Sequence, residues 1–423
     1  MKADIETFDV IVVGGGQAGL SASYYLKQHR LKHLVIERRG PAHAWRNERW
    51  DNFCLVTPNW QCQLPGFHYQ GDDPDGFMVK DEIIRYLEEY IRWLEPPLLN
   101  YVSVTSIENI GDTFKVITSS GEFISKQVII ACGSYHYPRI PVISKNISPG
   151  ILQLHSVDYK NASSLPQGGV MIVGSGQSGC QIAEDLFLDG RETHLAVGDA
   201  PRVSRRYRGK DVVNWLDEMG YYKTSIEHHE EGMDARLKTN HYVTGRDGGR
   251  DLNLRIFAEQ GMKLYGQMAS ADGDDIRFSD DLISHLDMAD DVARRINSDI
   301  EKYITKQGID APPDTNVESS YKPLARQSIN LLEEGISTII WSTGFAMDFS
   351  FIHCPVFDTR GVPVHKRGVT SQPGLYFLGL NWQYTWGSGR FYHVGNDARY
   401  LVEWIIESDK TTESTQQEID CLP

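Results

Sequence analysis

The fold is indicated by one stretch near the N-terminus, which reads Asp9-Val10-Ile11-Val12-Val13-Gly14-Gly15-Gly16-Gln17-Ala18-Gly19-Leu20. An apolar run with strand character leads directly into the pattern G-x-G-x-x-G, and small apolar residues follow it at helical spacing. In this pattern the first Gly makes a tight turn, the second lets a pyrophosphate approach the backbone, and the third lets the helix pack closely on the strand. The stretch therefore predicts a Rossmann-type dinucleotide-binding unit, with the pyrophosphate at the helix N-terminus.

The pattern occurs a second time, as Val170-Met-Ile-Val-Gly174-Ser-Gly176-Gln177-Ser178-Gly179-Cys180. One such motif is weak evidence, but two copies, each between an apparent strand and an apparent helix, predict two dinucleotides on one chain. This combination is typical of a flavoprotein that a nicotinamide reduces. We therefore expect an α/β fold with two Rossmann-like dinucleotide-binding domains.

The residues after each motif separate the two roles. Glu37 ends the next apolar run, 23 residues after Gly14, where a carboxylate binds the adenosine ribose. The matching position of the second motif is Val197, and the basic run 202–208 that follows suits a 2′-phosphate. We predict FAD at the first motif and NADPH at the second. Asp199 lies close enough to keep NADH as an alternative.

Composition limits the class of protein. The chain has 423 residues and a net charge of −15, which argues against nucleic acid or an anionic membrane surface as a partner. No apolar stretch reaches the ~18 residues of a membrane span, and the N-terminus runs directly into the first strand. Six cysteines are scattered without metal-ligand or disulfide spacing. We expect a cytoplasmic enzyme without a metal, and a homodimer remains open.

The order of the motifs predicts that the NADPH domain is inserted into the FAD domain. The expected parts are a first FAD segment at 1–165, an NADPH-binding domain with a helical insertion at 166–320, a second FAD segment at 321–407, and a polar tail at 408–423 without fixed structure. Apolar residues at i, i+3 and i+4 predict an amphipathic helix at 80–93.

Several further segments resemble the flavin-containing monooxygenase superfamily, and most closely its bacterial CzcO-like, nitrilase-cluster branch. The likeness covers residues 7–407. Besides the two glycine motifs, it rests on Trp45-Arg46, Pro58-Asn59-Trp-Gln-Cys-Gln63-Leu-Pro65-Gly66, Ala131-Cys132-Gly133-Ser134-Tyr135, His155-Ser156-Val-Asp-Tyr159, Ser342-Thr343-Gly344-Phe345 and Gly379 to Arg390. Two departures mark a distant or specialised member: the family's F-x-G-x-x-x-H-x-x-x-Y motif is loose around His155, and Cys132 replaces the usual Thr.

The resemblance implies a reaction. NADPH would reduce the flavin, and reduced flavin would react with O₂ to give a C4a-(hydro)peroxide that inserts one oxygen atom into a small organic substrate. Asn59 would be the catalytic residue, presenting its amide near the flavin; an ordinary turn after Pro58 explains it equally well. The pair His155 and Tyr159 is better explained by linker structure than by nicotinamide binding.

We expect a defined set of residues to contact the cofactors. Gly387 and Ser388 join this set because their turn would start a helix whose N-terminus faces the flavin. The full set is Gly14, Gly16, Gln17, Ala18, Gly19, Glu37, Arg38, Trp45, Arg46, Gln63, Cys132, Gly133, Gly174, Gly176, Gln177, Ser178, Gly179, Arg205, Arg206, Thr343, Gly344, Gly387 and Ser388. Trp382, Tyr384, Trp386 and Tyr392 are candidates for an aromatic substrate pocket, with half of them expected in the core.

Other functions stay open at this point. A reductase that passes electrons to a protein or small-molecule acceptor uses the same cofactors, although a disulfide reductase needs a close cysteine pair, and Cys54 and Cys62 are eight residues apart. A non-catalytic flavoprotein belongs to a different class. Among oxygenations, N-hydroxylation, S-oxidation, Baeyer–Villiger insertion and oxidative decarboxylation all suit this scaffold, because specificity depends on the pocket.

Overall fold

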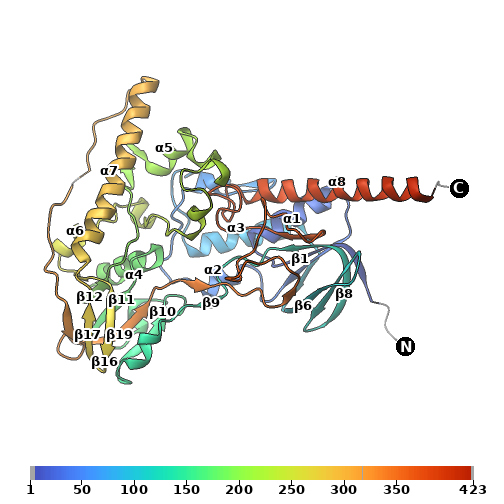
Figure 1. The fold of residues 1–423 in the computed structure, drawn as a ribbon. Coiled ribbons are helices and arrows are strands. Elements are labelled where there is room, and N and C mark those ends of the chain that lie inside the picture. Colours follow the sequence, from blue (N-terminus) through green and yellow to red (C-terminus); the bar gives the residue numbers. More distant parts are fainter. Residues whose placement is uncertain (1–4, 317, 421–423) are drawn as a thin grey trace.

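A computed structural model describes residues 5–316 and 318–420 of the chain. Two sheets, one from each half of the fold, lie at opposite sides of the molecule, and the chain crosses between them near β9 and β10 (Figure 1). None of the helices in these residues combines the length and apolar character that crossing a membrane requires.

The first sheet contains the first glycine motif. Strands β1, β2, β5, β8 and β22 pair in parallel, and β6 and β7 form an antiparallel extension. In spatial order its strands are β21 (Ile352–His353), β6 (Val104–Asn109), β7 (Phe114–Thr118), β8 (Gly121–Ile130), β1 (Thr7–Val13), β2 (His33–Glu37) and β5 (Leu98–Asn100), with β22 (Leu375–Phe377) beside β8.

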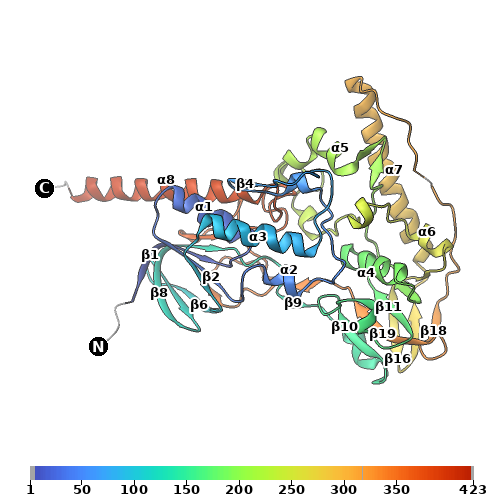
Figure 2. The same ribbon diagram turned by 180° about the vertical axis from the view of Figure 1, so that it is seen from behind.

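Strand β1 is buried on both faces, as its continuous apolar run requires. Val10 and Val12 face the cluster made with helices α1 (Gln17–Gln28), α3 (Lys80–Leu94) and α8 (Val394–Asp420), whereas Ile11 and Val13 face the side of β6 and β7. Helix α8 packs along α1 and then extends past the sheet, and α3 lies near α1 (Figures 1 and 2). The helix expected at 80–93 is confirmed by α3.

The second sheet is entirely parallel. Its order is β10 (Leu152–His155), β19 (Ile336–Trp341), β11 (Gly169–Val173), β12 (Thr193–Ala196) and β15 (Lys263–Tyr265). Helix α4 (Gln177–Leu188) follows β11, so the second motif also lies between a strand and a helix. The predicted fold class, two Rossmann-like units with one inserted into the other, is confirmed.

Smaller elements complete the molecule. The remaining strands are β3 (Gln63–Leu64), β4 (Phe67–His68), β9 (Tyr137–Pro138), β13 (Arg206–Tyr207), β14 (Lys210–Asp211), β16 (Met268–Asp272), β17 (Asp275–Phe278), β18 (Ser328–Asn330) and β20 (Phe345–Ala346). The remaining α-helices are α2 (His43–Asn47), α5 (Val212–Glu218), α6 (Leu254–Glu259) and α7 (Leu282–Gln307). Short 3₁₀ helices lie at Asn59–Gln61, Val142–Asn146, Ala162–Ser164, Tyr221–Lys223, Ile226–His228, Gly232–Leu237 and Arg246–Gly248.

The structure refines the expected segment boundaries. Strand β19 lies in the second sheet although the boundary at 320 assigns it to the FAD part, and β10 joins that sheet before residue 166. Helix α8 also continues to Asp420, through most of the tail expected to lack structure. No Gly or Pro follows Gly395 within this helix, so nothing in its sequence stops it. Residues 421–423 of that tail lie outside the described residues.

Candidate active site

A cavity of about 2060 Å³ is lined by residues of both halves of the fold. The turns after β1 and β11 both open into it, as does the segment 342–344 that follows β19. The other walls come from 44–57, from the insertion at 212–243, from one face of α7 and from 379–391. Both glycine motifs therefore face the same cavity.

The first glycine turn is shaped for the close approach of backbone and ligand. Gly14 has φ +113°, and a Cβ there would lie 2.5 Å from the carbonyl oxygen of Ala131. A Cβ on Gly19 would lie 1.8 Å from the carbonyl oxygen of Gly14, so α1 packs against the turn too closely for any side chain. A Cβ on Gly16 would meet nothing within 4 Å. The space beside Gly16 is thus open at the N-terminus of α1.

The second turn repeats this geometry. Gly174 has φ +103°, and a Cβ there would lie 2.7 Å from the carbonyl oxygen of Ser342. A Cβ on Gly179 would again lie 1.8 Å from a carbonyl oxygen, that of Gly174. A Cβ on Gly176 would touch Thr239 only at an ordinary 3.7 Å. Both turns therefore have the shape and the free helical N–H groups that a pyrophosphate needs.

Glu37 lies at the end of β2, directly beside the first turn. The backbone N–H of Gly15 donates to its Oε2 at 2.7 Å, and the N–H of Arg39 donates to its Oε1 at 2.7 Å. These two bonds fix the carboxylate at the wall of the cavity. Each carboxylate oxygen can accept more than one hydrogen bond, so Glu37 still has the capacity to bind ribose hydroxyls.

Fifteen of the cofactor-contacting residues expected from the sequence line the cavity. They are Gly14, Gly16, Gln17, Ala18, Glu37, Arg38, Trp45, Cys132, Gly133, Gly174, Gly176, Gln177, Ser178, Thr343 and Gly344. The others are not among the lining residues: Gly19, Arg46, Gln63, Gly179, Arg205, Arg206, Gly387 and Ser388. Gly19 and Gly179 still shape the turns from behind, whereas Arg46 pairs with Glu88 and the Gln63 amide donates to the carbonyl oxygen of Trp60 at 2.9 Å.

The basic run 202–208 does not point into the nicotinamide side of the cavity. Arg205 is buried and pairs with Asp211, with its Nη2 2.6 Å from Oδ2. Arg206 is exposed and donates to the carbonyl oxygen of Gly248 at 2.9 Å, and Arg208 pairs with Glu301. This geometry does not support a 2′-phosphate role for Arg205 or Arg206.

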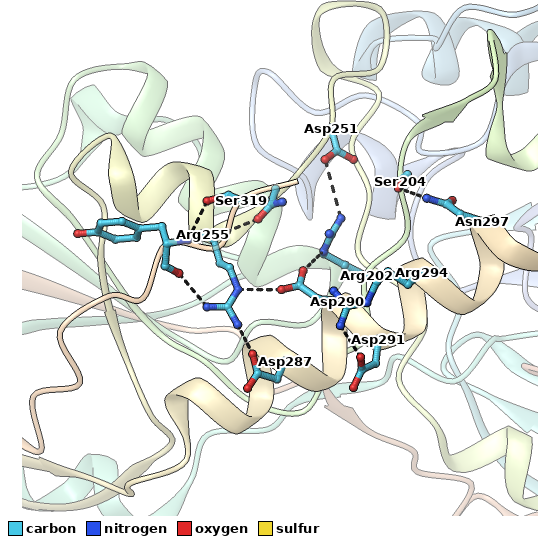
Figure 3. Close-up of polar contacts among 12 residues, drawn as sticks. Arg202, Ser204, Asp251, Arg255, Asp287, Asp290, Asp291, Arg294, Asn297 and Ser319 are labelled. Carbon is cyan, nitrogen blue, oxygen red and sulfur yellow. Dashed lines mark hydrogen bonds and ion pairs between the residues drawn. The ribbon is translucent and has the colours of Figure 1, made fainter. Parts of the chain in front are cut away.

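Arg202, at the start of the same run, belongs to a buried ionic cluster on α7 (Figure 3). Its Nε donates to Oδ1 of Asp290 at 2.6 Å, while the Nε of Arg255 donates to Oδ2 of the same carboxylate at 2.7 Å. Arg255 also pairs with Asp287. The cluster holds α7 against the second domain and leaves Arg202 engaged away from the cofactor.

Asn59 lies behind the cavity wall. Its side-chain N–H donates to the carbonyl oxygen of Asp73 at 2.9 Å, and its Oδ1 accepts from the N–H of Met78 at 2.7 Å. The side chain is buried and is not among those lining the cavity. Asn59 therefore ties down the loop at 73–78, and its geometry does not support the catalytic role expected for it.

The turn at 387–388 makes contacts within its own segment of the chain and does not face the cavity. Ser388 Oγ accepts the N–H groups of Tyr384 and Thr385, each at 3.0 Å, and a Cβ on Gly387 would lie 2.7 Å from Cβ of His393. The next residue, Gly389, does line the cavity, and its carbonyl oxygen accepts the side-chain N–H of Gln17 at 3.1 Å. This bond fastens the C-terminal segment to the first glycine turn.

Two of the four aromatic candidates line the cavity, and the other two are partly buried outside it. Trp382 and Trp386 line the cavity, and Tyr384 and Tyr392 do not. The hydroxyl of Tyr392 donates to Asp217 at 2.9 Å. His155 and Tyr159 have structural partners, the carbonyl oxygen of Gly344 at 3.0 Å and Asp185 at 2.7 Å.

Several cavity residues were missed by reasoning from the sequence. Arg49, Tyr221, Tyr222, Asn240 and Arg390 line the cavity although no motif singled them out as site residues. Tyr221, Tyr222 and Asn240 come from the insertion after β12, whose path over the site has no signature in the sequence. Arg390 was recognisable only as a basic residue at the end of an otherwise aromatic, glycine-rich segment.

The cysteine content of the cavity bears on its redox chemistry. Cys132 is the one cysteine among the lining residues in the described part of the chain. Burial raises the pKa of its thiol to about 12, so it stays protonated at neutral pH. All five cysteines that the structure describes are unpaired.

Comparisons with known proteins agree with this architecture. An uncharacterised CzcO-like oxidoreductase of Geobacillus kaustophilus is 33% identical over 401 residues, which cover 94% of this chain and 98% of that protein. A flavin-containing monooxygenase from Stenotrophomonas maltophilia has a similar fold, with a TM-score of 0.66 at 19% identity over 96% of this chain and 99% of that one.

A bacillithiol disulfide reductase from Bacillus cereus is similar in fold as well, with a TM-score of 0.61 at 14% identity over 95% of this chain and 100% of that one. The fold alone therefore does not separate oxygenases from reductases. The family model of pyridine nucleotide-disulphide oxidoreductases matches residues 11–244. Together with the CzcO-like relative, this match confirms the predicted resemblance: the chain belongs to the pyridine nucleotide-disulphide oxidoreductase family, in its CzcO-like branch.

Proposed function

We propose that the protein is an FAD-dependent, NADPH-reduced monooxygenase that inserts one oxygen atom of O₂ into a small organic substrate. The observation that carries the proposal is the shared cavity, into which both dinucleotide-binding turns open. Two cofactors bound at these turns would reach into the same space, so hydride transfer and oxygen chemistry need no separate site. The proposal is compatible with the flavin-containing monooxygenase of similar fold.

The residues of each turn fit one cofactor. The open space at Gly16 and the fixed carboxylate of Glu37 suit the pyrophosphate and ribose of FAD, and the open space at Gly176 suits the pyrophosphate of NADPH. When bound and reduced, the flavin supplies the two electrons that activate O₂. The chain's own contribution is to bind the two cofactors, orient them and keep water from the reacting atoms.

Four bulky aromatic side chains line one part of the cavity. Tyr221, Tyr222, Trp382 and Trp386 line it together, and the rings of Tyr222 and Trp386 lie 4.5 Å apart. Trp382 and Tyr222 are buried themselves. Such a wall lowers the local dielectric and limits the access of water, which favours oxygen transfer over release of hydrogen peroxide.

The alternative of a disulfide reductase lacks a redox-active pair. Such an enzyme needs two cysteines close together and one of them as a thiolate. In the described part of the chain, the cavity offers Cys132 alone, and its pKa is raised to about 12. A reductase that passes electrons to another acceptor remains the second candidate. It differs from an oxygenase in that no oxygen atom from O₂ enters a product.

The test is the coupling of NADPH oxidation to O₂ consumption. The FAD-loaded protein is supplied with NADPH in air, and NADPH, O₂ and hydrogen peroxide are followed together across a panel of amines, sulfides, ketones and carboxylic acids. We expect a substrate to lower the peroxide formed per NADPH oxidised and to yield a product that carries ¹⁸O from ¹⁸O₂. Rapid reduction of an added electron acceptor, with O₂ consumed slowly under every condition, would favour the reductase instead.

A further inference from the structure

Arg390 is a cation in the cavity wall without an acidic partner. Among the side chains that the structure describes, which end at Ser408, no carboxylate lies within ion-pair distance of its guanidinium. Its hydrogen bonds go to neutral oxygens, the carbonyl of Trp386 and Oδ1 of Asn240, the second at 3.2 Å. Burial lowers the pKa of the Arg390 guanidinium below its usual range. Its side chain is half-buried at the cavity wall, so an anion that enters the cavity can act as its counter-ion.

The guanidinium is held in one orientation. It stacks over the ring of Trp386 at 3.7 Å from the ring centre, while its two hydrogen bonds tie it to the C-terminal segment and to the insertion at 212–243. Stacking and bonding at fixed points limit the rotamers that a free arginine would sample. The remaining N–H donors are therefore preorganised for a ligand, which is the usual arrangement for recognising a planar anion.

Seven carboxylates line the cavity, and none of them forms an ion pair with Arg390: Glu37, Glu48, Asp199, Glu230, Glu231, Asp299 and Asp348. Several of them have other partners. Glu231 pairs with Lys238, and Glu48 pairs with Arg39. Glu37 accepts two backbone N–H groups. Arg390 therefore has no carboxylate partner in the described cavity wall, and its charge is available to an anionic ligand.

The surroundings of Arg390 suit a flat apolar body. Tyr222 and Trp386 pack 4.5 Å apart, and Tyr221 lies edge-on to Trp382 at 6.4 Å. Trp382 adopts φ +48°, a conformation that bulky residues rarely occupy, and its carbonyl oxygen accepts a bond from Arg236 at 3.0 Å. Local strain of this kind persists where the surrounding structure holds a side chain in position, often at a binding site.

We propose that the substrate is an aromatic or otherwise flat apolar carboxylate, and that Arg390 binds its carboxylate while Trp382, Trp386, Tyr221 and Tyr222 enclose its body. This inference rests on the proposed function for the reaction that follows binding. The pyrophosphates of the two cofactors have the helix N-termini at Gly16 and Gly176 as their anion sites. Neither pyrophosphate therefore needs Arg390. The 2′-phosphate of NADPH is the competing anion, and the effect of Arg390→Gln on NADPH binding distinguishes it from a substrate carboxylate.

The experiment measures binding to the oxidised, FAD-loaded enzyme, which requires no oxygen chemistry. Benzoate, phenylacetate and 3-phenylpropionate are titrated against the flavin spectrum, each beside its neutral primary amide. We expect at least one acid to bind about tenfold or more tightly than its amide, which corresponds to about 1.4 kcal/mol. Arg390→Gln should remove this preference, and Arg390→Lys should keep part of it because the charge remains.

Arg399→Gln is the matched control. Arg399 follows on α8, pairs with Glu403 on the surface and does not line the cavity, so this variant should keep the parent's preference for the acid. The inference is overturned if no acid binds more tightly than its amide, or if Arg390→Gln retains the preference. It is also overturned if Arg390→Gln weakens only NADPH, since Arg390 would then serve the nicotinamide.

The binding result and the oxygenation result are separable. If an acid binds through Arg390 but never acquires ¹⁸O, the anion site stands and the proposed oxygenase function fails. If oxygenation is found only for neutral or cationic substrates, the proposed function stands and the carboxylate site fails.

Discussion

At the scale of single residues, the second glycine of each motif offers a clean test of the cofactor sites. A Cβ on Gly16 or Gly176 would meet no backbone atom and leave the fold intact, yet it would occupy the space into which a pyrophosphate must come. Gly16→Ala should therefore lose FAD while its melting temperature stays near that of the flavin-free parent. Gly176→Ala should keep FAD but raise the KM for NADPH by about tenfold or more. Flavin content and reduction kinetics measure both effects, and full flavin in Gly16→Ala would refute the first assignment.

Arg205 gives a second prediction for a single residue, and it concerns the stability of the folded protein. Removing it leaves Asp211 buried without its cation, and breaking a buried pair costs about 3–5 kcal/mol. Arg205→Ala should lower the melting temperature strongly and leave the ratio of kcat/KM for NADPH and NADH unchanged. Arg206→Ala, at an exposed site nearby, is the control and should change neither quantity. A selective loss of NADPH in Arg205→Ala would restore the phosphate-binding role.

The site could be predicted from the sequence wherever the backbone itself recognises the ligand. Gly14, Gly174 and Glu37 follow directly from spacing, because the turn and the strand end fix their positions. The run 202–208 could not be interpreted this way, since an arginine serves an internal carboxylate as readily as a phosphate. Arg390 and Asn240 are 150 residues apart in the chain, and no sequence pattern around either residue predicts their contact.

At the scale of elements, helix α4 carries a carboxyl group that makes stability depend on pH. Burial raises the pKa of Glu184 from 4.5 to about 7. The folded protein therefore holds this proton more tightly than the unfolded chain, and stability falls as the pH rises from about 4.5 to about 7. Above this window the ionised group costs up to about 3 kcal/mol.

Glu184→Gln removes the group that titrates and should reveal this dependence. We expect the variant to melt at a temperature close to the parent's at pH 4.5 and clearly above it at pH 8. Thermal unfolding at both pH values measures the difference. An equal melting temperature at pH 8 would show that the fold tolerates the ionised carboxylate without cost.

Elements with a regular spacing of apolar residues, or with a recognisable sequence motif, could be predicted from the sequence. Helix α3 and the strands β1 and β11 lie where their patterns place them. Strand β10 could not be predicted from its own polar segment, because it forms by pairing with β19, which is far away in the chain. Helix α8 extends beyond its expected end because no Gly or Pro interrupts it there, whereas its polar composition alone favoured a tail without structure.

At the scale of the whole molecule, the two halves are connected through Asp185 on α4. Its carboxylate accepts bonds from Asn52 at 2.9 Å, from Tyr159 at 2.7 Å and from Arg246. These partners come from the first domain, the linker and the insertion after β12. This buried junction fixes the two halves of the fold so that both dinucleotide-binding turns face one cavity. The proposed function requires this arrangement.

The central claim is that the two cofactors meet in this cavity to activate O₂. The most direct measurement is stopped-flow absorbance after FAD-loaded enzyme, reduced by NADPH without oxygen, is mixed with O₂. We expect a transient species whose spectrum is neither that of reduced nor that of oxidised flavin, and whose lifetime an effective substrate shortens. Direct return to the oxidised spectrum, with and without substrates, would contradict it.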